Sequence, residues 1–320
     1  MKSLITGIKA TGQLHLGNYL GSFKQAIEFQ DSYDTYLFIA NLHSLTTNHD
    51  GESVKQLSYE LVLDLLSLGA DPDKATIFMQ SDVPEHSELT WILSCMCPMG
   101  ILERAHAWKD FKQKGLRDPN LGLFSYPILM AADILIHQPD IVPVGSDQKQ
   151  HLEIAQEIAK KFNNNYGPTF KIPKELITLT KDVPGIDGRK MSKSYNNYIP
   201  VFGSEAEIQK AIMKITTDSK GIEEKKDPES CNIFAIYKLL GNSQQIQNLQ
   251  DKYTAGGVGY ADLKKELLKL YLEYFKTAHE KRIELAKHPK KIIEILEFGA
   301  EKARKNARQN LDIVKEKTGV

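Results

Sequence analysis

A short turn near the start of the chain combines glycine with side chains that could bind phosphate. It contains HLGN at residues 15–18, where an apolar segment passes into an amphipathic run. Gly12 and Gly17 would let a ligand approach the backbone, and a helix beginning here would offer free N–H groups to an anion. His15 and Asn18 add side-chain donors. The turn predicts a polyphosphate site, and a plain strand-to-helix connection is the alternative.

A second segment places several cations close together. RKMSKS at residues 189–194 holds three basic side chains in five positions, interleaved with hydroxyls and preceded by Gly185 and Gly188. Such a loop could hold a pyrophosphate leaving group through charge-assisted hydrogen bonds. A lysine-rich run is also a common form of solvated surface. Together with the first turn, however, the loop favours chemistry on a nucleoside triphosphate.

One carboxylate interrupts an apolar segment. Asp133 lies in PILMAADILIH at residues 127–137, where the neighbouring side chains predict a buried helix face. A buried carboxylate without a partner is costly, so Asp133 needs hydrogen-bond donors. Those donors could belong to the protein itself or to a ligand.

The elements that would position these groups alternate between strand and helix. A helix is expected from Ser53, where an S-x-x-Q capping pattern begins, to Gly69, and others at 128–137 and after Asp147. Four apolar segments predict strands, at residues 3–6, 35–40, 76–81 and 140–144. Alternation of this kind predicts a parallel sheet that is covered by helices on both faces.

The pattern changes near residue 203. Beyond Glu205 the chain is almost entirely helix-patterned, with long amphipathic runs and no convincing strand. We therefore predict an α/β fold with two domains. Residues 1–203 would form a Rossmann-like, nucleotide-binding domain with a parallel sheet, and residues 204–320 a C-terminal all-α domain.

Composition excludes several classes of protein. Of the 320 residues 41% are hydrophobic and 26% charged, which is typical of globular domains and unlike disordered or fibrous chains. The 41 basic residues balance the 41 acidic ones, so the whole chain has no field that would hold nucleic acid nonspecifically. The last 40 residues are an exception, with eleven basic and six acidic residues. That segment is either a solvated helix face or an RNA contact.

Targeting and metal signals are absent from the sequence. Cys95, Cys97 and Cys231 form neither a disulfide framework nor a zinc motif, so we expect no metal bound by the protein itself. The first residues carry no apolar signal region, and no run reaches the roughly 20 apolar residues of a membrane helix. A cytoplasmic protein without membrane contact is expected.

The two motifs and their surroundings resemble a known family. HLGN is similar to the HIGH signature, and KMSKS matches the second signature, of class I aminoacyl-tRNA synthetases. The bacterial tryptophanyl branch of that class resembles this chain most in GIKATGQLHLGNYLGS, in LFSYPILMAADILIHQPDIVPVGSDQKQH at 123–151 and in TTDS at 216–219. The resemblance implies ATP-dependent activation of L-tryptophan to tryptophanyl-adenylate and its transfer to tRNA(Trp).

The resemblance also implies roles for individual residues. Asp133 would accept the indole N–H, and the remaining tryptophan-binding residues would be Met130, Tyr126, Gln148, His43, Val144 and Ile5. The catalytic residues would be His15, Asn18, Lys190, Lys193 and Lys109. The ATP-binding residues would be Lys9, Ala10, Thr11, Gly17, Asn18, Gly145, Ser146, Asp147, Val183, Lys190, Met191, Ser192, Lys193 and Ser194.

Further expectations concern partners. The resemblance implies Mg²⁺ bound with ATP, a homodimer formed with the help of a connective insert at about 45–120, and contact of the tRNA anticodon with the helical domain. The final helix would pack back on the catalytic domain. Three alternatives stay open at this point: a tyrosyl-tRNA synthetase, another nucleotidyltransferase with a related histidine motif, and a synthetase-like RNA-binding protein without catalysis.

Overall fold

The computed structural model describes residues 1–113, 119–145, 148–177 and 183–320. Packing divides the chain into two compact units, each built from separate stretches of sequence. Unit 1 comprises Met1–Gly12, Gln25–Leu179 and Leu285–Val320, and unit 2 comprises Gln13–Lys24 and Thr180–Glu284. The functional boundary predicted at residue 203 stays a prediction.

Unit 1 contains a five-stranded sheet with the order β3-β2-β1-β4-β5. All neighbouring strands are parallel, so the predicted Rossmann-like sheet is confirmed. The strands are β1 Ser3–Ile8, β2 Asp34–Ile39, β3 Ala75–Met79, β4 Ile141–Val144 and β5 Lys174–Ile177.

The central strands form because they can be buried on both faces. In β2 every residue after Asp34 is buried, which is the pattern of a strand covered on two sides. β5 was not predicted from the sequence. Its exposed Lys174 and Glu175 break the apolar run, because β5 is the last strand of the sheet.

Two predicted helix starts are wrong by about a turn or more. Helix α4 begins after Asp50, whose carboxylate accepts from the backbone N–H of Glu52, and not at Ser53, whose hydroxyl accepts from Asn48. Helix α8 begins after Asn120, which caps it in the same way. The helices of unit 1 are α2 Lys24–Glu28, η2 Phe29–Asp31, α3 Asn41–Ser44, α4 Gly51–Ser67, η3 Gln80–Asp82, α5 Glu85–Ser94, α6 Met99–Glu103, α7 His106–Gln113, α8 Leu121–Leu135, α9 Lys149–Tyr166 and α14 Pro289–Thr318.

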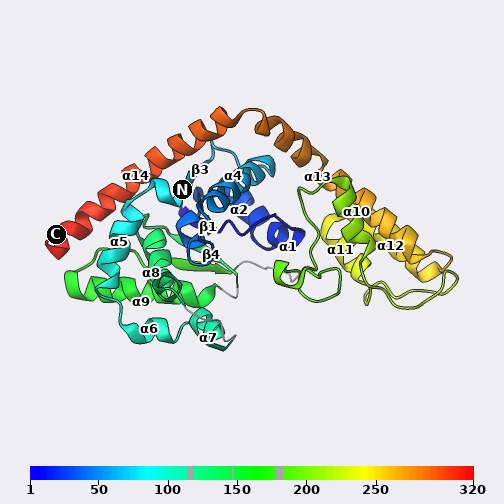
Figure 1. The fold of residues 1–320 in the computed structure, drawn as a ribbon, viewed down its shortest axis with the longest axis horizontal. Helices are drawn as coiled ribbons and strands as arrows, with labels where there is room; N and C mark the ends of the chain where they lie inside the picture. Colours follow the sequence, from blue (N-terminus) through cyan, green and yellow to red (C-terminus); the bar gives the residue numbers. More distant parts are fainter. Residues whose placement is uncertain (114–118, 146–147, 178–182) are drawn as a thin grey trace. The chain divides into compact units, whose positions relative to one another are not determined.

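Helix α14 packs against β3 and α5, as Figure 1 shows. Its inner face, with Ala303, Ala307 and Leu311, belongs to the same apolar core as the strands. Gly299 makes the close approach possible, because a Cβ atom there would overlap the backbone of Ile77. The end of the chain is thus an integral part of the sheet domain.

Unit 2 is helical in its longer stretch, which confirms the helical C-terminal region predicted beyond residue 205. Capping boxes at Ser204 and Asn242 fix the starts of two helices. Aromatic side chains such as Phe234, Tyr253 and Tyr271 are fully buried in it. Its helices are α1 Leu16–Asn18, the π-helical η1 Tyr19–Phe23, η4 Lys193–Tyr195, α10 Glu205–Met213, α11 Asn232–Leu240, α12 Ser243–Ala255 and α13 Tyr260–Ala286.

A membrane-crossing helix would need both length and an apolar surface. None of the helices that the structure describes combines the two.

Candidate active site

Asp133 on α8 is the centre of a buried polar cluster in unit 1. Its side chain is 1% exposed. One carboxylate oxygen lies 2.6 Å from Nδ1 of His86 and 2.7 Å from Nε2 of Gln80. The other lies 2.9 Å from Nε2 of His43 and 2.8 Å from the same Gln80 nitrogen. The partners that Asp133 requires are therefore supplied by three different elements, α3, η3 and α5.

This cluster keeps Asp133 ionised. Burial by itself would raise the pKa of the carboxyl group, but the hydrogen bonds and charge of His43 and His86 hold that pKa well below its usual value. The next residue of the cluster is His137, where burial, followed by the charge of His86, lowers the pKa to about 3. His137 is thus neutral at pH 7, and the negative charge stays on Asp133.

Two of the predicted tryptophan-binding residues, His43 and Tyr126, lie close to Asp133 in unit 1. The ring of His43 meets the ring of Tyr126 edge to face, with centroids 6.0 Å apart. The hydroxyl of Tyr126 lies 2.6 Å from Nε2 of His151, which was not predicted. The structure therefore brings His43, Tyr126 and Asp133 together.

Other predicted pocket residues contribute mainly to the apolar surroundings. Ile5 on β1 and Val144 on β4 are buried, and Met130 on α8 is partly buried against the same core. Gln148 is exposed directly before α9. The tryptophan-binding role of each stays a prediction.

The predicted ATP-binding residues in unit 1 are more scattered. The ammonium of Lys9 donates to the hydroxyls of Thr46 and Thr47 at 3.1 and 3.3 Å, and burial lowers its pKa. The carbonyl of Ala10 accepts from Ser44 at 3.3 Å, and Thr11 is exposed.

The remaining predicted residues of unit 1 are less informative. Gly145 is partly exposed after β4, Lys109 is exposed on α7, and Ser146 and Asp147 lie outside the described residues.

The HLGN turn forms the first half of the site in unit 2. His15 precedes the three-residue helix α1, and its Nδ1 accepts from the backbone N–H of Asn18 at 3.2 Å. Burial, followed by the charge of Lys193, lowers the pKa of His15 to about 4. The imidazole is therefore neutral at pH 7 and carries its proton on Nε2, which can donate to a phosphate oxygen.

The KMSKS loop packs directly on this turn. The backbone N–H of Gly17 lies 3.2 Å from the sulfur of Met191. A Cβ atom at Gly17 would lie 3.1 Å from the His15 ring and 3.2 Å from Met191, so only glycine fits without displacement. The backbone of Met191 in turn donates to the carbonyl of Val183 at 2.8 Å. Two motifs that are 174 residues apart in sequence thus form one cluster.

A buried asparagine shapes the loop and was not predicted. Asn197 accepts from the N–H of Ser192 at 2.8 Å and donates to the carbonyl of Lys190 at 3.1 Å. It also donates to Asp187 at 2.7 Å. Lys190 and Ser194 remain exposed at the ends of the loop. The hydrogen bonds of Asn197 therefore fix the backbone conformation of the loop that carries Lys190 and Lys193.

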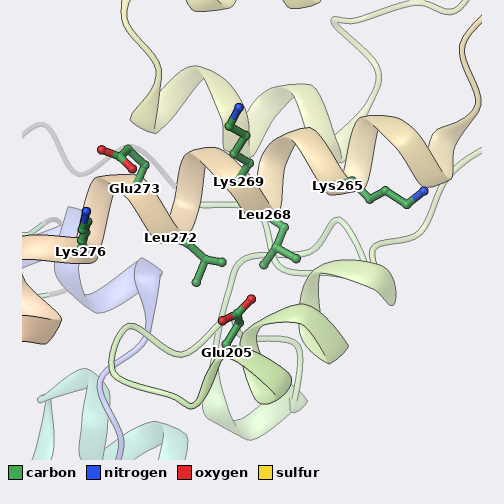
Figure 2. A pocket seen from close by; sticks show the side chains of 7 residues that line it. All are labelled: Glu205, Lys265, Leu268, Lys269, Leu272, Glu273 and Lys276. Atoms are coloured by element: carbon green, nitrogen blue, oxygen red, sulfur yellow. The ribbon is translucent and has the colours of Figure 1, made fainter.

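A separate hollow lies on unit 2, between α10 and α13 (Figure 2). Its volume is about 440 Å³. Lys265, Lys269 and Lys276 line it together with Glu205 and Glu273. Leu268 and Leu272 complete the lining, in which three lysines outnumber two glutamates.

Comparison with known proteins identifies the family of this chain. The family model for class I tRNA synthetases (W and Y) matches residues 2–276. The tryptophan–tRNA ligase of Fusobacterium nucleatum subsp. nucleatum is 50% identical over 322 residues, which cover 100% of this chain and 98% of that protein. The enzyme of that name from Campylobacter jejuni is 48% identical, with 99% of each protein covered.

Solved structures agree in fold as well. The crystal structure of tryptophanyl-tRNA synthetase from Campylobacter jejuni complexed with ADP and tryptophan has a TM-score of 0.95 and 48% identity, and covers 99% of this chain and 100% of that one. The tryptophanyl-tRNA synthetase from Mycoplasma pneumoniae has a TM-score of 0.82 at 32% identity, and covers 100% of this chain and 98% of that one. This chain therefore belongs to the class I tRNA synthetases of the tryptophan and tyrosine type.

Proposed function

We propose that this protein is a tryptophan–tRNA ligase. It activates L-tryptophan with ATP, giving tryptophanyl-adenylate and pyrophosphate, and transfers the tryptophanyl group to tRNA(Trp). Relatives with that name match the chain from end to end, which favours tryptophan over tyrosine as the substrate.

The observation that carries this proposal is the ionised, buried Asp133. A carboxylate in apolar surroundings can accept a ring N–H, and an amino acid without that N–H would leave the carboxylate with one bond fewer. His43 and Tyr126 lie on the same side of the cluster, as expected for residues that contact an aromatic ring. Phenylalanine would fill the space but has no ring N–H that could donate to Asp133.

The HLGN and KMSKS cluster acts on ATP. The tryptophan carboxylate attacks the α-phosphorus and pyrophosphate leaves, without a covalent bond to the enzyme. Neutral His15 donates from Nε2, and Lys190 and Lys193 offset the charge that gathers on the leaving group. Gly17 and Asn197 hold these donors in place, so positioning is the main contribution of the protein.

Mg²⁺ would accompany the nucleotide. Within the described parts of the chain, no group of three His, Cys, Asp or Glu side chains could hold a metal ion. The ion would instead be held by the ATP phosphates, which is a usual mode for Mg²⁺, and would neutralise part of their charge.

The tRNA contacts the helical segment 204–320. The hollow lined by Lys265, Lys269 and Lys276 supports this assignment, because phosphate groups of RNA pair with lysine. Lys269→Ala should lower the rate of tRNA charging and leave the activation of tryptophan unchanged. Equal rates of tRNA charging by the variant and the unmodified protein would show that the hollow does not contact tRNA.

The protein forms a homodimer in the cytoplasm. Trp91 and Met99 of the predicted insert are 72% and 62% exposed, and a second chain could cover both side chains. Light scattering of the purified protein should give twice the mass of the chain. The mass of one chain at micromolar concentration would contradict the dimer.

The test of the central proposal is ATP–pyrophosphate exchange with tryptophan, tyrosine and phenylalanine in turn. Exchange with tryptophan alone is expected. Exchange with tyrosine would contradict the proposal, and Asp133 would then recognise a phenol and not an indole. If none of the three amino acids supports exchange, the protein would be an RNA-binding protein without catalytic activity.

A matched pair of variants tests the ATP-binding cluster. Lys193→Ala should reduce exchange about a hundredfold, the usual effect of losing one charge that stabilises the transition state. Lys225→Ala removes an exposed lysine elsewhere on unit 2 and should have no effect. Equal rates for the two variants would show that the loop does not hold the leaving group.

A further inference from the structure

A chain of hydrogen bonds leads from Asp133 to the last helix of unit 1. Nδ1 of His86 lies 2.6 Å from the carboxylate, and Nε2 of the same ring lies 3.0 Å from Nε2 of His137. Nδ1 of His137 lies 2.9 Å from Oδ1 of Asn306 on α14. Four side chains, from α8, the turn that follows it, α5 and α14, are therefore connected in one line.

The positions of the protons in this chain of hydrogen bonds can be assigned by starting from Asn306, at the end farthest from Asp133. Oδ1 of Asn306 can only accept, so Nδ1 of His137 carries a proton. Because His137 is neutral, its Nε2 must accept, and Nε2 of His86 must donate. The ionised carboxylate of Asp133 can only accept, so Nδ1 of His86 donates to it.

Aromatic rings shield this chain of hydrogen bonds from water. The His137 ring lies 5.1 Å from that of Tyr36 and 5.8 Å from that of Phe78, measured between centroids. The His86 ring lies 5.9 Å from that of Phe38. His86 is 0% and His137 5% exposed, so water does not compete for these hydrogen bonds.

The donors of Asp133 differ in how firmly they are held. Gln80 and His86 are completely buried, whereas the side chain of His43 is 12% exposed and lies on the four-residue helix α3. His43 is therefore the least buried of the three donors. Gln80 and His86 fix the orientation of the carboxylate from inside the core.

We propose that His86, His137 and Asn306 are positioning residues for the selection of tryptophan, so that helix α14 takes part in amino-acid specificity. The inference rests on the proposed function, because it needs Asp133 to accept the ring N–H. None of the three residues touches the substrate. They act by fixing the charge and the direction of the Asp133 carboxylate.

The test compares tryptophan with its benzothiophene analogue, in which sulfur replaces the ring N–H. The measured quantity is the ratio of kcat/KM for the two in ATP–pyrophosphate exchange. Asn306→Leu should lower this ratio about tenfold, mainly through a higher KM for tryptophan, because one hydrogen bond in the line is lost. The kcat at saturating tryptophan should change much less.

Two further variants separate positioning from stability. Asn310→Leu removes a hydrogen bond to the carbonyl of Ile136, one turn further along the same face of α14, and should leave the ratio unchanged. Asn306→Gln keeps a neutral side-chain carbonyl that could accept from His137 and should restore the ratio at least in part.

The outcomes distinguish this inference from the proposed function. If the unmodified protein does not catalyse ATP–pyrophosphate exchange with tryptophan, the proposed function is wrong. If it is active and selective, and Asn306→Leu has the same ratio of kcat/KM for tryptophan and the analogue, the inference is wrong. It is also wrong if Asn310→Leu lowers the ratio as much as Asn306→Leu does.

Discussion

Replacing Asp133 by asparagine tests the central feature of unit 1. The change preserves the size of the side chain and removes its charge. Three donors surround the carboxylate at 2.6 to 2.9 Å, and two of them are histidines. Asparagine keeps one oxygen and directs an NH₂ group at a position where a donor already points.

The burial of Asp133 and its contacts with two histidines determine how much stability and activity Asp133→Asn should lose. Breaking a buried ion pair by changing one partner costs about 3–5 kcal/mol of unfolding free energy. For a unit of this length that corresponds to a Tm lower by roughly 10 °C. The neutral amide is also a weaker acceptor for a ring N–H, so kcat/KM for tryptophan should fall about a hundredfold.

Thermal unfolding and ATP–pyrophosphate exchange measure the two effects separately. Asp140→Asn is the matched control, because that partly exposed carboxylate accepts from Ser3 and Lys171 and has no predicted role in the site. It should lose far less stability and no selectivity. If Asp133→Asn keeps both its Tm and its preference for tryptophan over phenylalanine, Asp133 is neither the buried anion nor the acceptor described above.

Three more predictions follow from single residues. Gly299→Ala should lower the unfolding free energy by about 3 kcal/mol in urea denaturation, since the new Cβ overlaps Ile77, whereas Gly51→Ala meets open space and should not. Lowering the pH from about 6.5 toward 3 should destabilise the protein, because the unfolded chain protonates His137 while the folded one does not; His137→Phe should flatten this dependence. Asn197→Ala should raise the KM for ATP roughly tenfold in the exchange assay and leave the KM for tryptophan unchanged, because only the KMSKS loop loses its support.

The parts of the site that the sequence could predict are those with a local signal. HLGN and KMSKS are contiguous motifs, and Asp133 stands out because its neighbours are apolar. His137 follows Asp133 by only four residues, but it lies in the turn after α8, so helical spacing alone would not have predicted its contact with the cluster.

Other partners of Asp133 had no local signal. Gln80 and His86 are 53 and 47 residues from Asp133, and 169 residues separate Asn306 from His137. Only the tertiary fold brings such residues together. Strand β5 was missed for a related reason, because its position as the last strand of the sheet, and not its composition, makes it a strand.

The discontinuous course of unit 1 has a consequence for how the protein is made. A ribosome produces the five strands early, then residues 180–284 of unit 2, and only afterwards helix α14. Until α14 arrives, strand β3 lacks the helix that packs against it, and an uncovered strand edge is a site of aggregation. Unit 2 can therefore finish folding on the ribosome before unit 1 does. A nascent chain that ends after residue 284 would contain all of unit 2 but a sheet without α14, and its uncovered strand would favour aggregation.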